Sequence, residues 1–214
     1  MGIISLDPAV QIILIPVLIF ALSFHEFAHA WAAYRLGDST AASYGRLTLN
    51  PLAHLDPFGA IVLYLAGFGW AKPVPVDARY LENPRRDMLW IALAGPVSNL
   101  IVAAVSGLLL RILWGGGLIN GSSVLTTVLV MSLQINLALA FFNFLPVPPL
   151  DGSRIMAGLI PARNQSWLYN LEIYGPRVLF GLILLGVFTG VSVIWWVIGP
   201  FITLFRTIFT LGMF

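Results

Sequence analysis

Residues 8–34 read PAVQIILIPVLIFALSFHEFAHAWAAY, and this stretch decides the fold of the chain. Between residues 8 and 24 the only polar side chains are one glutamine and one serine. An apolar run of this length predicts a transmembrane helix, because about 20 such residues span the hydrocarbon core of a bilayer. The second half contains His25, Glu26 and His29, and ionisable groups at membrane depth are costly enough to indicate a functional site. The stretch therefore predicts a membrane protein with polar chemistry inside the bilayer.

The composition of the whole chain supports this class. Hydrophobic residues make up 59% of the 214 residues and charged residues only 9%, with a mean hydropathy of +0.92. A soluble domain carries about a quarter charged residues, so we predict an all-α, polytopic membrane protein formed as one domain over residues 1–214. The net charge of +2 and the lack of a basic run argue against nucleic acid as a partner. The chain has no cysteine, which excludes disulfides and thiolate metal ligands.

The apolar stretches predict a bundle of about four to six transmembrane helices. Spans are expected at about residues 8–34, 88–114, 124–145 and 176–198, with a last interfacial or returning helix at 200–213. The boundary between the last two is placed at Gly199-Pro200, since this pair disrupts helices. Residues 45–76 are expected to form a short re-entrant or β-hairpin-like segment, because their apolar part is too short to cross the membrane. Its extended pieces would either pack on the bundle or pair with an unwound substrate.

Basic residues predict the orientation of the chain. Most of them fall between the first and second spans or after the third span: Arg35, Arg46, Lys72, Arg79, Arg85, Arg86, Arg154 and Arg163. Lys and Arg concentrate on the cytoplasmic side of membrane proteins. We therefore expect a multi-pass protein of the cell membrane whose N-terminus is outside. The C-terminal ends of the first and third spans would then meet on the cytoplasmic side.

The spacing His25-Glu26-x-x-His29 predicts a metal site. Residues four apart share one helix face, so both imidazoles can reach one ion, and Glu26 can act on water beside it. This arrangement is typical of zinc hydrolases, in which the Glu is the general base. The alternative is an interhelical network of hydrogen bonds, which is disfavoured because an unpaired carboxylate in the membrane would need neutralising. Zinc is the expected cofactor.

A catalytic zinc ion takes three protein ligands and leaves one position open. Two residues could supply the third ligand, and both are expected on the cytoplasmic side. Asp151 follows a proline-rich break after the third span, although an Asp-Gly pair is more often a turn or a helix cap. His54 lies in the first connection, where it could equally be a hydrogen-bonded loop residue. The residue pattern alone leaves both alternatives open.

Further polar residues lie within the predicted spans. Asn136 and Asn143 are seven residues apart, hence on one helix face, and Gln134 lies nearby. Asn99 follows Pro96 in the second span. We interpret Gln134, Asn136 and Asn99 mainly as interhelical hydrogen-bonding residues.

Two motifs resemble the site-2 protease family of intramembrane zinc metalloproteases. They are HEFAH at residues 25–29 and NFLPVPPLDG at residues 143–152, which is similar to that family's Asn-x-x-Pro…Leu-Asp-Gly signature. The similarity extends over most of the chain, including residues 95–99, and fits a short form without PDZ or CBS domains.

The resemblance implies a role for each matching residue. His25, His29 and Asp151 would be the zinc ligands, Glu26 the catalytic residue, and Asn143 a residue that engages substrate or polarises the transition state. The resemblance assigns no role to His54, for which we consider a gating function or an inhibitory or alternative ligand. The implied substrates are transmembrane proteins, cleaved within or near their spans. The competing functions are a membrane transporter of metal or other ions and a non-proteolytic, helix-binding scaffold, and the chain lacks the two similar halves common in transporters.

Overall fold

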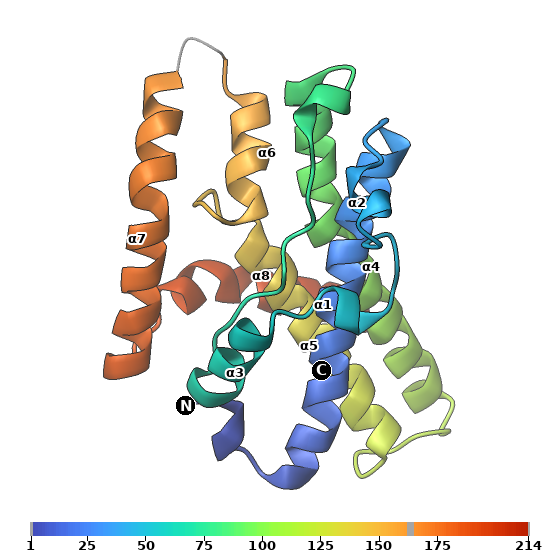
Figure 1. Ribbon diagram of the computed structural model, residues 1–214. Helices are drawn as coiled ribbons and strands as arrows, with labels where there is room; N and C mark the ends of the chain where they lie inside the picture. Colours follow the sequence, from blue (N-terminus) through green and yellow to red (C-terminus); the bar gives the residue numbers. More distant parts are fainter. Residues whose placement is uncertain (1, 162–164, 214) are drawn as a thin grey trace.

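The computed structural model describes residues 2–161 and 165–213, and over these residues the protein is all-helical (Figure 1). Five helices are long and apolar enough to cross a membrane, which confirms the predicted polytopic bundle. They are α1 (Pro8–Arg35), α4 (Pro84–Gly115), α5 (Val124–Asn143), α7 (Gln165–Thr189) and α8 (Val193–Thr210). Arg163, which contributed to the predicted orientation, lies outside the described residues.

Local signals set the ends of the first helix. Asp7 is the N-cap of α1 and accepts a hydrogen bond from the Ala9 amide at 2.7 Å, and Pro8 occupies the first helical position. The Asp7 side chain thus pairs an amide of the first turn that has no partner within the helix. Pro8 has no backbone N–H, so it leaves no further amide unpaired. The helix then continues through Pro16, and its last turn contains Arg35. One unbroken helix therefore carries both histidines and the glutamate of the HEFAH motif.

The division of the last apolar stretch differs from the prediction. The predicted spans at 176–198 and 200–213 are wrong in their boundaries, because the break lies between α7 and α8, at residues 190–192. Gly190 has a φ of +73°, a left-handed conformation that glycine adopts without strain. Ser192 then caps α8 by accepting from the Trp195 amide. Pro200 lies inside α8, as proline can in apolar helices whose neighbours satisfy the freed backbone groups.

The connection between α1 and α4 is irregular coil that contains two short α-helices and two 3-10 helices. They are α2 (Thr40–Ser43), η2 (Pro51–Ala53), α3 (Pro57–Ala66) and η3 (Ala78–Tyr80). The expected β-hairpin-like pairing is limited, among the described residues, to one isolated antiparallel bridge between Leu55 and Ala71. The apolar part of this segment is helical instead, because Asp56 caps α3 at the Gly59 amide and Gly67 ends it at a φ of +80°. In Figure 1 the connection starts and ends at the same end of the bundle, and α3 lies at the level of the lower half of α1.

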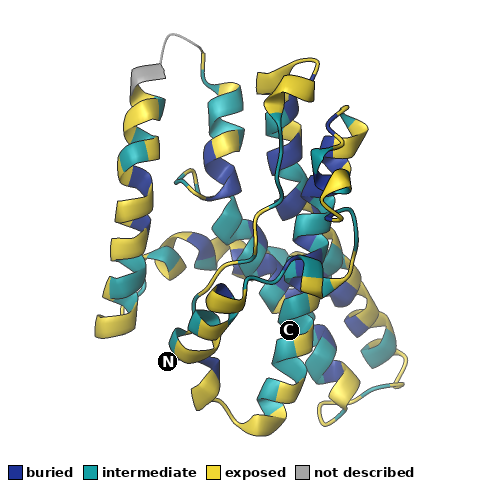
Figure 2. Ribbon diagram, in the orientation of Figure 1, coloured by how far each residue is buried: buried dark blue, intermediate teal, exposed yellow. Residues whose placement is uncertain are grey.

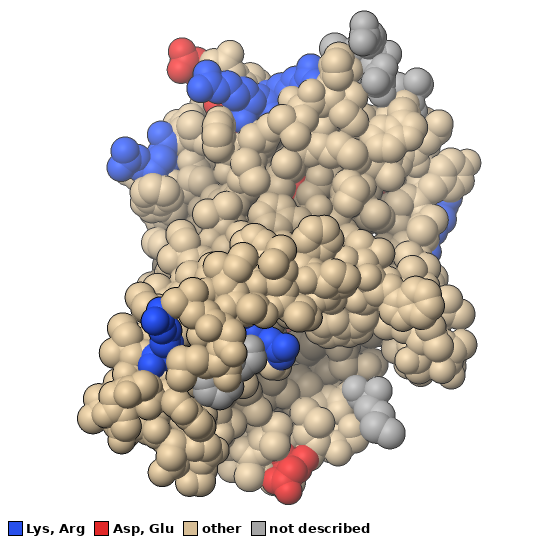
Figure 3. All heavy atoms as spheres, turned by 180° about the vertical axis from the view of Figure 1, so that it is seen from behind, with Lys and Arg blue, Asp and Glu red and all other residues tan. Residues whose placement is uncertain are grey.

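Helix α4 is the centre of the packing. It contacts α1, α5, α6 (Asp151–Leu159) and α8, so most of the bundle shares one core. One apolar cluster joins α4, α5 and α8 through Ala103, Leu133, Leu137, Ile198 and Ile202. Figure 2 shows buried residues concentrated where these helices meet, while outer faces are exposed. On the face seen in Figure 3, charged side chains are sparse: they lie mainly toward the upper edge and in two basic groups below the middle, with a mostly uncharged band between. Such a band is expected of a surface that contacts lipid.

Candidate metal centre

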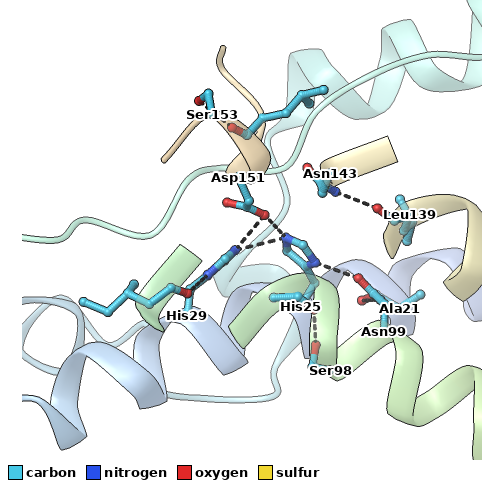
Figure 4. A network of polar contacts seen from close by, with 12 residues as sticks. Ala21, His25, His29, Ser98, Asn99, Leu139, Asn143, Asp151 and Ser153 are labelled. Atoms are coloured by element: carbon cyan, nitrogen blue, oxygen red, sulfur yellow. Dashed lines mark hydrogen bonds and ion pairs between the residues drawn. The ribbon is translucent and has the colours of Figure 1, made fainter. Parts of the chain in front are cut away.

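Helix α1 presents two imidazoles toward the interior of the bundle. His25 and His29 are one helical turn apart and are only 5% and 8% exposed. Their Nε2 atoms lie 3.0 Å from each other, and the two rings meet edge to face (Figure 4). Both Nε2 atoms therefore point into one small volume, as the spacing of four residues predicts.

Asp151 reaches the same volume from the start of α6. Its Oδ2 lies 3.1 Å from Nε2 of His25 and 3.3 Å from Nε2 of His29. The residue is the first of α6 and follows the proline-rich chain that leaves α5. Gly152 allows this approach, because a Cβ there would overlap the carbonyl oxygens of Phe144 and Leu145. The Leu-Asp-Gly motif thus seats α6 directly against the end of α5 and aims the carboxylate at the histidines.

The donor set fits a zinc ion. One ligand atom from each of His25, His29 and Asp151 lies within 4.8 Å of the others. In a tetrahedral site with metal–ligand bonds of about 2.0–2.1 Å, ligand atoms are about 3.3–3.4 Å apart, close to the three separations of 3.0, 3.1 and 3.3 Å seen here. Oδ2 of Asp151 is buried, and among the described residues it faces these two nitrogens but has no hydrogen-bond donor. A buried carboxylate oxygen facing two imidazole nitrogens is a site that a cation completes.

The other nitrogen of each histidine is held by the protein. Nδ1 of His29 donates to the carbonyl oxygen of Ile91 at 2.7 Å. Nδ1 of His25 lies 2.6 Å from Oδ1 of Asn99, whose amide nitrogen donates to Ala21 O and to Asn136 Oδ1. The amide oxygen must therefore be the acceptor, and Nδ1 of His25 carries the proton. Both Nε2 atoms are left with free lone pairs, which is the tautomer that zinc requires.

Asn99 is the functional residue whose specific role the sequence interpretation missed. It does make the expected interhelical hydrogen bond, to Asn136 on α5 at 2.8 Å. It also orients His25, one of the three residues His25, His29 and Asp151 that we call the metal group. Asn99 is fully buried, and the Asn136 amide continues the chain to Ser132 O. The available signal was an amide side chain in an apolar span close to Gly95, but the spacing alone does not say which partner it meets.

The Asn99→Ala variant is expected to bind zinc about 10- to 100-fold more weakly, because outer partners that fix a histidine ligand are worth about that much in metal affinity. Competition with a chelator of known affinity measures the change. Ser98→Ala is the matched control, since Ser98 is a buried neighbour whose hydroxyl donates to Gly95 O of its own helix. An unchanged zinc affinity in Asn99→Ala would show that His25 is oriented without the amide.

Gly95 brings α4 into contact with both imidazoles. A Cβ at this position would overlap Nε2 of His29 and the Cε1 atoms of both histidines. Glycine is therefore required here by the close approach of the two helices, and Ile91 and Asn99 on the same face can reach the Nδ1 atoms. The packing of α4 on α1 thus sets the geometry of the metal group.

Glu26 lies next to this group without belonging to it. The three atoms that converge come from His25, His29 and Asp151, and Glu26 contributes none of them. Glu26 is half-buried and directly follows His25 on α1. This placement leaves its carboxylate free to act on water or substrate beside the ion.

The structure does not bring His54 or Asn143 into the metal group. His54 is 1% exposed, and both of its ring nitrogens have partners in its own loop, Thr48 and Arg46. Asn143 is the last residue of α5, and its amide nitrogen donates to Leu139 O of the same helix at 3.0 Å (Figure 4). Of the two residues left open as the third ligand, Asp151 is the one that lies beside the histidines.

A polytopic helical membrane protein with a buried His-His-Asp centre belongs to the class of membrane metallohydrolases. Residues 13–123 and 119–186 match the sequence profile of peptidase family M50. The chain therefore belongs to peptidase family M50, which confirms the resemblance to site-2 proteases, and it is a zinc metalloprotease that hydrolyses peptide bonds.

Individual relatives agree with this family. The chain is 46% identical over 165 residues to YwhC of Bacillus subtilis (strain 168), a match that covers 76% of this chain and 75% of the relative. It is 33% identical over 177 residues to Rip2 of Mycolicibacterium smegmatis, covering 78% of this chain and 64% of that one. It is 41% identical over 135 residues to MJ0611 of Methanocaldococcus jannaschii, covering 62% and 63%. All three relatives are named as zinc metalloproteases. No solved structure gave a significant match to this chain.

Proposed function

We propose that this protease hydrolyses peptide bonds within or near the transmembrane segments of other membrane proteins. The observation that carries the proposal is the position of the metal group. Two of its donors come from the C-terminal half of α1, a helix long and apolar enough to cross the membrane, and all three donor atoms are buried. A substrate that reaches them must enter among membrane helices, which favours a chain that already lies in the bilayer. The shared contacts of α4 support treating residues 1–214 as a single membrane-embedded domain.

We assign separate roles to the residues of the site. His25, His29 and Asp151 hold zinc, and a zinc ion bound there supplies a Lewis acid that polarises a carbonyl and activates water. Glu26 takes a proton from the attacking water and passes it to the leaving amine. Asn143 engages the substrate backbone, since it ends α5 just before the chain that leads to Asp151. Family membership supports hydrolysis over ion transport for this set of residues.

We also propose that residues 45–76 are re-entrant. Helix α3 has 10 residues, hence a length of about 15 Å, which is half the thickness of the hydrocarbon core of about 30 Å. It lies beside η1 (Ile3–Ser5), just before α1, while the connection begins and ends at the other end of the bundle. A substrate helix must unwind before its peptide bonds are accessible. The coil on either side of α3 offers extended backbone with which the unwound substrate can pair.

We propose that the active site opens toward the cytoplasm of a cell membrane. The support is the bias of Lys and Arg to the connection between α1 and α4. Cysteines introduced singly into this cysteine-free chain test the orientation. Positions 38–43 should react with a membrane-impermeant reagent from the cytoplasmic side only, and positions 117–122 from the opposite side only. The reverse labelling pattern would contradict the proposed orientation.

Cleavage in lipid tests the function itself. The purified protease, reconstituted in vesicles with a panel of single-span membrane proteins, should cleave some of them within or near the span, as mass spectrometry of the product ends will show. Chelation of zinc should stop the cleavage and added zinc should restore it. A protein that holds zinc but cleaves no member of a broad panel would contradict the proposed substrate class.

A further inference from the structure

Arg46 and His54 are buried in the connection between α1 and α4, yet neither belongs to the metal group. Arg46 is 5% exposed and His54 is 1% exposed. Burying a guanidinium and an imidazole is costly unless their polar atoms are used. Their contacts therefore indicate what the two residues do.

The two side chains close the connection on itself. His54 donates from Nε2 to Thr48 O at 2.7 Å, and its Nδ1 accepts from Nη2 of Arg46 at 3.4 Å. The same Nη2 donates to Lys72 O, and Nη1 donates to Pro73 O at 3.3 Å. The backbone completes the closure, because the Lys72 amide donates to His54 O at 2.8 Å. We call this group the Arg46–His54 clamp; it ties the chain entering α3 to the chain leaving it.

The clamp leaves the charge of Arg46 uncompensated within the loop. All its polar partners there are neutral, and its Nε is buried without a hydrogen-bond partner. Among the described residues no carboxylate lies within ion-pair distance of Arg46. Burial lowers the pKa of Arg46, and the charge of Glu26 on α1 opposes this shift only in part. Since η2, which leads into His54, packs on α1, the clamp faces the helix that carries the site.

A second contact links the clamped chain to the metal centre. Val76 and Leu81, which follow Lys72–Pro73, pack in a cluster with Ala32 and Ala33 of α1 and with Ile91 of α4. Ile91 is the residue whose carbonyl oxygen holds Nδ1 of His29. The position of the returning chain is thus coupled to the elements that orient a metal-binding histidine.

We propose that Arg46 and His54 are positioning residues for the hydrolysis: the clamp holds the returning chain against α1 and α4, beside the carbonyl group of Ile91 that orients His29. Neither residue touches the reacting atoms. His54 keeps the guanidinium in place through its unprotonated Nδ1, and the fork of Arg46 spans two consecutive carbonyls that a lysine could not bind together. This inference rests on the proposed hydrolysis, with His29 as a zinc ligand.

The test compares Arg46→Gln, Arg46→Lys and His54→Gln with wild type in vesicles. Arg79→Gln is the matched control, because Arg79 is in the same connection but its side chain is 86% exposed. In Arg46→Gln we expect kcat to fall about 10- to 100-fold, since a small misplacement of a catalytic group costs up to about 100-fold. KM, zinc content and thermal midpoint should stay near wild type. Arg46→Lys should recover little of kcat, because a lysine cannot bind both carbonyl oxygens at once. His54→Gln should lower kcat less than Arg46→Gln, and Arg79→Gln should not change it.

Several outcomes would overturn the inference. A kcat within twofold of wild type in Arg46→Gln removes the positioning role, and an Arg46→Lys variant with the kcat of wild type removes the role of the guanidinium fork. Loss of zinc and of thermal stability in parallel with kcat makes the clamp merely structural. Limited proteolysis separates this result from a failure of the proposed function: if wild type holds zinc but cleaves nothing, faster proteolysis between residues 46 and 73 in Arg46→Gln supports the clamp, and unchanged protection overturns it.

Discussion

The Glu26→Gln variant is expected to keep its zinc and its fold but to lose cleavage by roughly 100- to 10,000-fold, the range that general acid–base catalysis contributes. The reason is the position of the residue. Glu26 contributes no atom to the group formed by His25, His29 and Asp151, so replacing its carboxylate by an amide removes a base and not a ligand. Gln has nearly the same shape as Glu, and the half-buried site should accommodate it without repacking.

Three measurements on one preparation decide this prediction. Zinc content by mass spectrometry should be about one ion per chain in both proteins, and their thermal midpoints should agree. Cleavage of a substrate found in the panel should then be compared at equal zinc occupancy. Turnover of Glu26→Gln close to that of wild type would remove Glu26 from the mechanism, and a loss of zinc would show that it is a ligand after all.

The Asp151→Ala variant is expected to lose zinc. Removing a residue that only orients a ligand lowers metal affinity by about 10- to 100-fold, and removing a ligand should lower it further. Its Oδ2 is the third of the three converging donors and lies 3.1 and 3.3 Å from the two imidazole nitrogens. Without it two neutral imidazoles remain, and two neutral ligands hold a divalent ion weakly in a buried site. Activity should fall together with occupancy, because the ion is lost before any chemistry can start.

His54→Ala is the matched control for the ligand assignment. His54 is the third histidine of the chain and the alternative ligand from the sequence, but its ring nitrogens bond to Thr48 and Arg46. This variant should therefore retain zinc at the wild-type level, even if its turnover is lower. The opposite pattern, with zinc kept by Asp151→Ala and lost by His54→Ala, would transfer the ligand role to His54.

Features that depend on local sequence were predicted well. Whether an apolar run can span the hydrocarbon core depends on its own length and not on its neighbours. The polytopic class therefore followed from composition and length. His25 and His29 share a face because four residues make one turn, and this holds in any straight helix. The error at the C-terminal end has a local cause too: Gly199-Pro200 was interpreted as a break, but proline is tolerated in apolar helices, and the turn forms at Gly190 instead.

Features that depend on which elements meet required the tertiary structure. Asp151 and His54 were both plausible ligands by residue type, and the chain alone does not say which one approaches α1. The packing decides it: Gly152 lets α6 seat against the end of α5, and Gly95 lets α4 press on the two imidazoles. The same packing turned Asn99 from one interhelical amide among several into the partner of His25.

The sequence by itself thus determined the membrane class, the histidine pair and the glutamate beside it, because these follow from hydrophobic length and helical periodicity. The tertiary structure alone decided the third donor, the proton on each histidine and the contacts of Arg46 with His54, Lys72 and Pro73. These features join residues as far apart as 126 positions, from His25 to Asp151. Contacts of that kind depend on how closely two helices approach each other. The approach is set by a few glycines where helices cross, such as Gly95, and no local sequence pattern distinguishes these from the other glycines of the chain.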